Sequence, residues 1–393
     1  MDRINIKSML ESIVGPENVS DDPFELVCYS RDVSPEVPRL PLIIVRPHST
    51  EEISRIMILA NHARIPVACW SGGTNVVGAI AGNAILIDMT AMNKIIEIDE
   101  DNLTVTAQAG ITWGRLLTEL EQRGWTTGPC PQCGLVSTIG GGVALSNNAV
   151  FSGKYGLVGE QVVGLQVVLP TGEILRTGSG ANPNSKNFYR YAWASDLTGL
   201  FIGSHGVLGI ITEVTLKLYP LPEARESCGY GFDSLEAALR ALHEIQRLRI
   251  PIEYAGIALK EHTPQLEYPA SLLPIIVSGM KEEVQVWIDK IHKICLKLGG
   301  KRLPQELADA QAEWVMKARY LTAALFGNEP PPNSRSLVYM HPCCSCLPTL
   351  EVQKLIEKTK AFIKEMGLEK YKISIAFAIW ACANCVICSP LIY

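Results

Sequence analysis

The stretch CWSGGTNVVG at residues 69–78 turns sharply on two adjacent glycines. Gly72 and Gly73 have no Cβ atoms, so consecutive backbone N–H groups can converge there on an anion. Ser71 and Thr74 add hydroxyl donors, and Asn75 tolerates unusual backbone angles. The pattern fits a site for a pyrophosphate, and an ordinary β-turn is the alternative interpretation.

The residues before this loop predict a β-α-β unit. The apolar run PLIIV (41–45) predicts a buried strand, and STEE (49–52) predicts the start of a helix. Ser49 or Thr50 can cap the free N–H groups of that helix, and the two acids suit its positive end. VACW (67–70) predicts the second strand, which therefore ends on the glycine turn.

Two further glycine-rich stretches follow, PCPQCGLVSTIGGGVALSNN (129–148) and LTGLFIGSHGVLGIITEV (197–214). Residues 127–159 are too polar and irregular to predict a core element, and loops of that length usually carry function. The glycines do not form the G-x-G-x-x-G fingerprint at a first βα turn. Gly153-Lys154 is followed by tyrosine, so a Walker A motif is also excluded.

Composition limits the class of protein. The chain has 393 residues, of which 47% are hydrophobic and 19% charged, which predicts a well-buried globular protein of two domains. The net charge is −5, and no basic stripe indicates nucleic acid as a partner. The N-terminus has no apolar region of the signal-peptide kind, so we expect a cytoplasmic protein. The 12 cysteines are then expected to be thiols or metal ligands.

The second half of the chain has a plainer pattern. FDSLEAALRALHEIQRLRI (232–250) and MKEEVQVWIDKIHKICLKLGG (280–300) predict amphipathic helices. IEYAGIAL (252–259) and LLPIIVSG (272–279) predict strands between them. We therefore expect an α+β layer, with helices on one face of a sheet, after a boundary near Pro222.

The ordered combination of motifs resembles the FAD-linked oxidases and dehydrogenases of the vanillyl-alcohol oxidase type, with a PCMH-type FAD domain. Within that superfamily the chain is most similar to the glycolate oxidase and D-lactate dehydrogenase branch. The motifs that carry the resemblance are RPHSTEEI (46–53), SGGTNVVGA (71–79), STIGG (137–141), KYG (154–156), VVGLQVVLPTGEILRTG (162–178) and LFIGSHGVLGIITEVTLKLYP (200–220). They cover most of residues 38–221.

The resemblance implies a fold and its domains. Residues 1–37 would form an N-terminal helix and connector, and residues 38–221 an α+β FAD-binding domain of two subdomains. Residues 222–393 would form an α+β cap domain with an antiparallel sheet that carries the substrate. On this comparison the cap would lack the C-terminal segment that such relatives usually have.

The same resemblance implies cofactor-binding residues. The loop at residues 71–76 would bind pyrophosphate through its backbone, and Ser137 and Thr138 would line the pyrophosphate and ribityl region. The full set implied for the cofactor is Ser71, Gly72, Gly73, Thr74, Asn75, Val76, Gly78, Pro129, Ser137, Thr138, Gly140, Gly141, Gly142, Asn148, Gly206 and Ile211. We expect FAD to be bound non-covalently, because Thr74 stands where one branch has a histidine tether and Cys130 matches a cysteine tether only loosely.

Catalytic residues are harder to assign. Relatives often have Ser-Glu-Gly where this chain has Ser204-His205-Gly206. The His205 side chain could contact the cofactor or a partner, and a tolerated loop substitution is the simpler interpretation. The final segment has no histidine, and no charged residue after Lys372, so we find no general base there. His341, in YMHPCCSC, is the remaining candidate for a catalytic residue.

The C-terminal cysteines admit two interpretations. Cys382, Cys385 and Cys388 have a C-x2-C-x2-C spacing that is seen in iron–sulfur ligation. The run is apolar and reads as strand, and cysteine is also a common small core residue, so core cysteines are favoured and no metal is expected. Residues 373–393 are uncharged and long enough to span a bilayer, but the family-like β pattern favours a buried sheet over a membrane span.

Two functional hypotheses follow. In the first, the protein is an FAD-dependent dehydrogenase of a 2-hydroxy acid or related alcohol, with an iron–sulfur subunit or another carrier as electron acceptor. In the second, it is an FAD-binding electron-transfer or structural subunit of a larger redox complex, without its own substrate site, or a truncated form of a longer flavoenzyme. The substrate, the acceptor and any homo-oligomer are left open.

Overall fold

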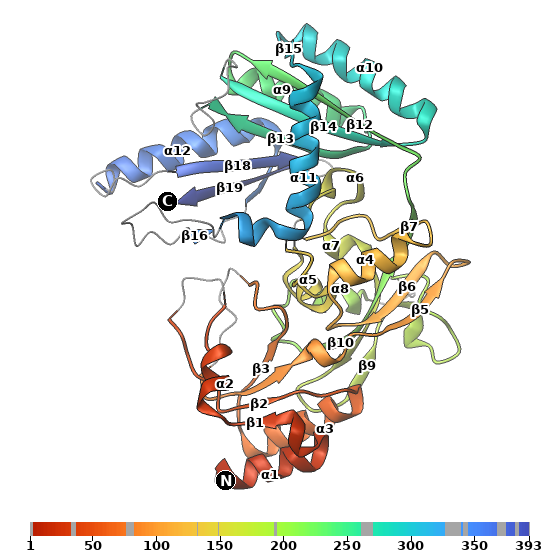
Figure 1. The fold of residues 1–393 in the computed structure, drawn as a ribbon, viewed down its shortest axis with the longest axis vertical. Helices are drawn as coiled ribbons and strands as arrows, with labels where there is room; N and C mark the ends of the chain where they lie inside the picture. The colour runs from red at the N-terminus through yellow and green to blue at the C-terminus, as the bar shows by residue number, and fades with distance from the viewer. Residues whose placement is uncertain are drawn as a thin grey trace. The chain divides into compact units, whose positions relative to one another are not determined.

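The computed structural model divides the chain into two compact units (Figure 1). The structure describes residues 3–32, 37–75, 82–131, 133–147, 149–191, 195–260, 270–326, 339–340, 345–367, 375–381 and 385–392. The first unit comprises residues 1–148 and 157–220, and the second comprises residues 149–156 and 221–393. The change near residue 221 lies close to the expected boundary. Residues 149–156 differ from the expectation, because they group with the second unit.

The first unit begins with a small sheet of order β1-β2-β4-β3, in which β2 and β3 both run parallel to β4. Its strands are β1 (Val19–Ser20), β2 (Ile43–Val45), β3 (Val67–Trp70) and β4 (Ile85–Asp88). Helices α1 (Arg3–Val14) and α3 (Thr50–Ala63) lie side by side next to this sheet, and α2 (Pro23–Cys28) and the short η1 (Pro16–Asn18) precede β2 (Figure 1).

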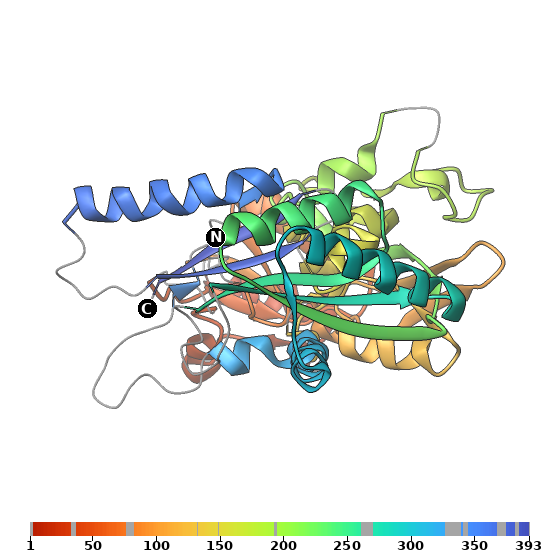
Figure 2. The ribbon, with the colours of Figure 1, turned by 90° about the horizontal axis from the view of Figure 1, so that it is seen from above.

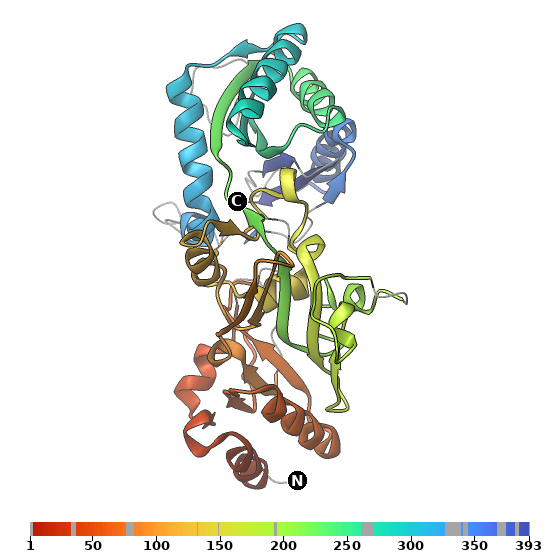
Figure 3. The same ribbon diagram turned by 90° about the vertical axis from the view of Figure 1, so that its right-hand side faces the viewer.

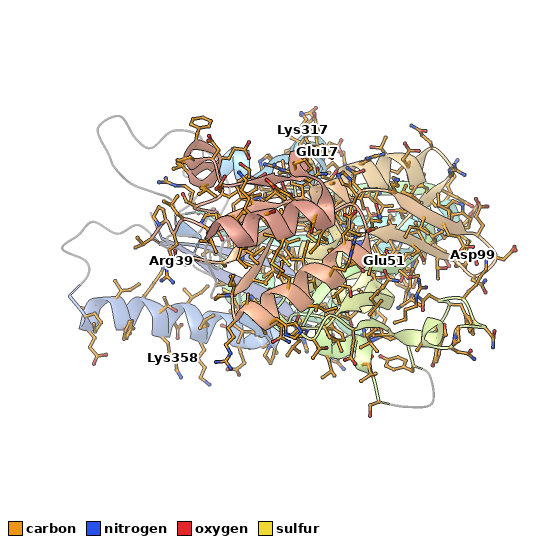
Figure 4. All side chains as sticks on the ribbon, turned by 90° about the horizontal axis from the view of Figure 1, so that it is seen from below. Glu17, Arg39, Glu51, Asp99, Lys317 and Lys358 are labelled. Carbon is orange, nitrogen blue, oxygen red and sulfur yellow. The ribbon has the colours of Figure 1, made fainter. Side chains whose placement is uncertain are left out.

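Helix α3 begins where its sequence predicts. The Ser49 hydroxyl accepts a hydrogen bond of 3.2 Å from the backbone N–H of Glu52, so the serine caps the first turn. Glu51 is exposed in that turn and points outward in Figure 4. Arg64 ends the helix with a left-handed φ of 54°.

A five-stranded antiparallel sheet of order β5-β6-β10-β8-β9 completes the first unit. Its strands are β5 (Ile95–Asp99), β6 (Thr104–Gln108), β8 (Val162–Val168), β9 (Ile174–Arg176) and β10 (Ile210–Lys217). The remaining elements are η2 (Met89–Ala91), α4 (Trp113–Glu121), β7 (Trp125–Thr126), α5 (Ile139–Leu145), α7 (Val158–Gln161), η3 (Gly178–Ala181), α8 (Leu197–Phe201) and β11 (Tyr219–Pro220). Residues 127–159, predicted to be irregular, thus contain short helices.

The second unit is built on a larger antiparallel sheet of order β15-β12-β14-β13-β18-β19-β16, with β17 also paired to β19. Its strands are β12 (Ala224–Phe232), β13 (Ile252–Leu259), β14 (Ser271–Gly279), β15 (Lys301–Arg302), β16 (Tyr339–Met340), β17 (Ser345–Leu347), β18 (Ile375–Ala381) and β19 (Val386–Ile392). Its helices are α6 (Ser152–Tyr155), α9 (Leu235–Arg247), α10 (Lys281–Lys297), α11 (Gln305–Phe326) and α12 (Val352–Glu365), with η5 (Thr349–Glu351) before α12.

Helices cover both faces of this sheet, which corrects the expectation that they lie on one face. The main core packs α9, α10 and α12 against one face, through side chains such as Leu242, Ile291 and Val352. A second cluster packs α11 and the start of α6 against the other face, and contains Phe151, Ile276 and Val315. Figure 2 shows α9 and α12 on one side and α11 on the other, and Figure 3 shows α11 across the sheet from α9 and α10. The alternation of side chains along β14 supplies both cores, with Ile275 and Val277 in the main core and Ile276 in the second cluster.

The uncharged stretch near the C-terminus contributes β18 and β19, which pair along seven residues each. This agrees with the buried-sheet interpretation of that stretch. In the part of the chain that the structure describes, no helix is both long enough and apolar enough to cross a bilayer.

Candidate functional site

The first unit contains a cavity of about 180 Å³ at the end of β3. The lining comes from residues 69–71 and 73–75 at the end of β3 and in the loop after it, from residues between 137 and 147 around α5, and from residues between 205 and 211 at the start of β10 and just before it. Asp32, Met89 and Ala109 complete it. The three glycine-rich stretches of the sequence, which lie far apart along the chain, therefore meet at one place.

Eleven of the residues implied for the cofactor lie on this lining. They are Ser71, Gly73, Thr74, Asn75, Ser137, Thr138, Gly140, Gly141, Gly142, Gly206 and Ile211. Gly72 and Pro129 are described but do not line the cavity. Val76, Gly78 and Asn148 lie outside the described residues, as does the catalytic candidate His341.

The loop after β3 presents unused hydrogen-bond donors. Within the described chain, the backbone N–H groups of residues 71–74 donate to no protein acceptor. Gly73 has a left-handed φ of 63°, which reverses the chain direction in the middle of the loop. Free N–H groups in a tight turn are a binding site for an anionic oxygen, as the sequence predicted.

Gly72 has a different role from its neighbours. A Cβ built on Gly72 would lie 2.2 Å from the carbonyl oxygen of Val136 and 3.2 Å from the Cα of Ser137. The glycine therefore allows the loop after β3 to pack directly on the segment that leads into α5. It sets the position of the donor groups and does not itself face the cavity.

Helix α5 lines one part of the cavity. The backbone N–H groups at its start already donate hydrogen bonds within the protein. The N–H of Ile139 donates to Ile111 O, that of Gly140 to Ala109 O at 2.9 Å, and that of Gly141 to the Thr138 hydroxyl at 3.2 Å. A Cβ on Gly140 would lie 2.6 Å from the Cβ of Ala109. The glycines of α5 therefore permit close packing against neighbouring segments such as that of Ala109. Their N–H groups do not serve as hydrogen-bond donors to a ligand in the cavity.

Ser137 carries a buried polar atom without a partner. Its side-chain oxygen has no hydrogen bond in the structure, although the residue is 6% exposed and lines the cavity. An unpaired buried hydroxyl is costly, which indicates that a bound group completes its hydrogen bonding. The unused N–H groups and this hydroxyl together fit a phosphate-containing cofactor.

His205 also lines the cavity. Its backbone has a left-handed φ of 54°, and its N–H donates to Ala144 O at 2.8 Å, so the turn is held against α5. The exposed side chain of His205 belongs to the cavity lining. Among the described lining residues Asp32 is the only carboxylate, and there is no lysine or arginine. Neutral donors therefore surround most of the cavity.

Trp70 was not predicted from the sequence to be a site residue, yet it lines the cavity. It contacts Tyr29, which is itself hydrogen-bonded to a buried carboxylate. Its ring meets the ring of Tyr29 edge-on, with centroids 5.3 Å apart. The Tyr29 hydroxyl donates to the buried Asp88 carboxylate at 2.7 Å, and Arg46 Nε lies 3.7 Å from the same carboxylate. Burial and this hydrogen bond raise the pKa of Tyr29, so its hydroxyl stays a donor at neutral pH. The signal in the sequence was Trp70 itself, at the end of a strand that leads into the glycine turn.

The metal interpretation of the cysteines gains no support from the described residues. Cys388 is buried in the main core of the second unit, and Cys385 is half-buried, with its backbone oxygen accepting from Gln246 at 2.9 Å. Cys382 lies outside the described residues. Over the ranges that the structure describes, no group of three or more His, Cys, Asp or Glu side chains could hold a metal ion.

Comparisons with known proteins agree on the class of domain. Residues 41–178 match the model of a family described as an FAD binding domain. The chain is 32% identical over 321 residues to the glycolate oxidase subunit GlcD of Bacillus subtilis, which covers 79% of this chain and 66% of that protein. It is 34% identical over 242 residues to D-lactate dehydrogenase [cytochrome] 1, mitochondrial, of Saccharomyces cerevisiae, which covers 58% of this chain and 39% of that protein. The chain thus spans less than two thirds of the length of either relative.

The fold is also found among solved structures. The structure of p-cresol methylhydroxylase with substrate bound superposes with a TM-score of 0.82 at 18% sequence identity, covering 100% of this chain and 83% of that chain. At this identity the likeness concerns the fold, which is the α+β arrangement expected from the sequence.

Proposed function

Because this chain belongs to the FAD-linked oxidase and dehydrogenase family of the vanillyl-alcohol oxidase/PCMH superfamily, with FAD as its cofactor, we propose that it dehydrogenates a 2-hydroxy acid or a related alcohol. FAD, when bound, accepts the hydride that leaves the carbon bearing the hydroxyl group. The protein orients the substrate and excludes competing reactions.

The observation that carries this proposal is the set of unused donors around the cavity. The N–H groups of residues 71–74 and the Ser137 hydroxyl would hold the pyrophosphate of FAD. Thr138, Gly140, Gly141 and Gly142 would form the wall beside it, and Gly206 and Ile211 the opposite wall. No cysteine or histidine in this set is required as a tether, so non-covalent binding stays our prediction.

A second role, as the FAD-bearing subunit of a larger redox complex, has one observation in its favour. The relative from Bacillus subtilis is named as a subunit, and this chain covers 66% of it. An iron–sulfur or other electron-acceptor subunit would then be the partner, and the substrate site would need it or a further segment. The cytoplasmic location expected from the sequence stays a prediction.

The visible spectrum of the purified chain tests the proposal. We expect flavin absorption, and we expect it to bleach when D-lactate, glycolate or a related 2-hydroxy acid is added without oxygen. Bleaching by one member of the panel would identify the substrate class. Flavin that stays oxidised with every acid would contradict the dehydrogenase and favour the subunit role, and a chain without flavin would contradict both.

A further inference from the structure

A short helix of the second unit holds a lysine against the large sheet. Helix α6 packs on β13 so closely that a Cβ on Gly153 would lie 2.5 Å from the carbonyl oxygen of Ile252. Phe151 and Tyr155, on either side, pack with Ile276 and Tyr254 of the sheet. The helix therefore fixes the Lys154 side chain over this face.

Lys154 has neutral partners only. Its ammonium donates to the backbone oxygen and to the hydroxyl of Ser278, both at 3.0 Å, and Ser278 is fully buried. No carboxylate oxygen of the described residues lies within 4.0 Å of it. Burial lowers the pKa of Lys154, as expected for a half-buried cation that lacks a direct counter-ion.

Three charged side chains act on Lys154 through space: the carboxylates of Glu253 and Glu283 and the guanidinium of Arg225. Glu253 sits at a register shift between β13 and β14 and is 1% exposed. Arg225, directly opposite Ser278 on β12, binds the Glu253 carboxylate through Nε at 2.5 Å and through a terminal nitrogen at 3.0 Å. This two-point pair occupies the Glu253 carboxylate, so Lys154 makes no direct ion pair among the described residues.

A second donor lies on the same face of the sheet. Tyr254 on β13 pairs with Ile276 of β14, two residues from Ser278, and side chains two residues apart share a face. No described residue forms a hydrogen bond with the half-buried Tyr254 hydroxyl. Burial raises the pKa of Tyr254 to about 12, so the hydroxyl remains a donor at neutral pH.

We propose that Lys154 and Tyr254 form a binding site for the carboxylate of an organic-acid substrate, with Ser278 positioning the lysine. The biological role of this site rests on the proposed function. Its chemistry is that of one cation, the Lys154 ammonium, and one neutral donor, the Tyr254 hydroxyl, on the same face of the sheet. A phosphate ester would use the same donors but carries more charge than one lysine balances. A carboxylate carries one negative charge, which one ammonium group can pair.

Oxalate is a suitable probe for the full chain loaded with FAD, because it has two carboxylates and no C–H bond from which a hydride could leave. We expect calorimetric titration to show oxalate binding, and oxamide, the neutral analogue, to bind at least tenfold more weakly. Lys154→Met should weaken oxalate binding by roughly 10- to 100-fold, as loss of a charge-assisted hydrogen bond does. Lys154→Arg should restore part of the loss, and Tyr254→Phe should weaken binding several-fold.

Lys290 provides a matched control: its ammonium lies 5.1 Å from the ring centre of Trp287, as that of Lys154 lies 5.1 Å from the ring centre of Tyr155, but it has no serine partner among the described residues. Lys290→Met should leave oxalate binding unchanged, and flavin content and melting temperature report folding in every variant. Equal oxalate affinity in wild type, Lys154→Met and Tyr254→Phe would overturn the site, as would tighter binding of inorganic phosphate than of oxalate. Lysine-dependent oxalate binding without any bleaching by hydroxy acids would support this site and contradict only the proposed dehydrogenase.

Discussion

Substitution of Gly72 by alanine tests whether the backbone of the loop after β3 binds the cofactor. The added Cβ would meet the Val136 carbonyl oxygen at 2.2 Å, so the loop would have to move by about 1 Å to restore van der Waals contact. A hydrogen bond of ordinary length, stretched by that amount, is no longer a hydrogen bond. Because Gly72 does not line the cavity, the methyl group would act only by displacing the donors.

The magnitude follows from the hydrogen bonds at risk. A hydrogen bond to a charged group contributes about 1.5–3 kcal/mol, so loss of one from the loop weakens FAD binding roughly 10- to 150-fold. Overpacking of this kind also lowers the free energy of unfolding by about 1–3 kcal/mol. Fluorescence titration of the FAD-free protein with FAD measures the first effect, and urea unfolding measures the second.

Gly279→Ala is the matched control. Its Cβ would have Glu283 Oε2 as its nearest neighbour, at 3.7 Å, which is an ordinary van der Waals contact within the second unit. We expect wild-type FAD affinity and stability for this variant. A Gly72→Ala protein that binds FAD within twofold of wild type would refute the argument that this loop, held by its contact with Val136, carries the cofactor.

Three further predictions concern single side chains. Ser137→Ala should weaken FAD binding several-fold while leaving the FAD-free protein equally or more stable, because the variant removes an unpaired buried hydroxyl; a loss of stability alone would contradict this. Arg225→Met should lower the free energy of unfolding by about 3 kcal/mol, since it leaves the buried Glu253 carboxylate unpaired, and urea unfolding at neutral pH would show it. Hydrogen bonds hold the pKa of Asp99 at about 2, below its value of roughly 3.9 in the unfolded chain, and the hydrogen bond from Asn102 has the largest effect. The contribution of Asp99 to the free energy of unfolding is therefore complete above about pH 4 and is lost as the pH falls through 2. Asp99→Asn should therefore flatten the decline of the urea midpoint over that range, and an unchanged acid profile would count against the assignment.

Local sequence predicted the parts of the site that depend on local chemistry. Glycines and hydroxyl residues that follow a strand, as at residues 71–74, specify a tight turn with free N–H groups wherever the turn lies. The cap of α3 at Ser49 is also local, since donor and acceptor are three residues apart. For the same reason the helices α9 and α10 could be predicted from their apolar spacing.

Features set by distant partners could not be predicted. Gly72 faces Val136 and not the cavity, because the loop packs on the Val136 carbonyl group. The first N–H groups of α5 donate to the carbonyl oxygens of Ala109 and Ile111, which lie on a different segment of the chain. The inclusion of Trp70 in the lining depends on Tyr29, which reaches it from an N-terminal helix turn. Periodicity along one segment contains no information about such contacts.

The place of residues 149–156 in the second unit has a consequence for synthesis of the chain. Phe151 is buried against Ile276, which leaves the ribosome about 125 residues later, and against Val315, which follows later still. At a synthesis rate of roughly 5–20 residues per second, Phe151 therefore stays uncovered for on the order of ten seconds before its packing partners have been made. The N-terminal unit thus emerges with the apolar residues of segment 149–156 uncovered, and this segment is suited to transient protection by a chaperone until the sheet that covers it has been made.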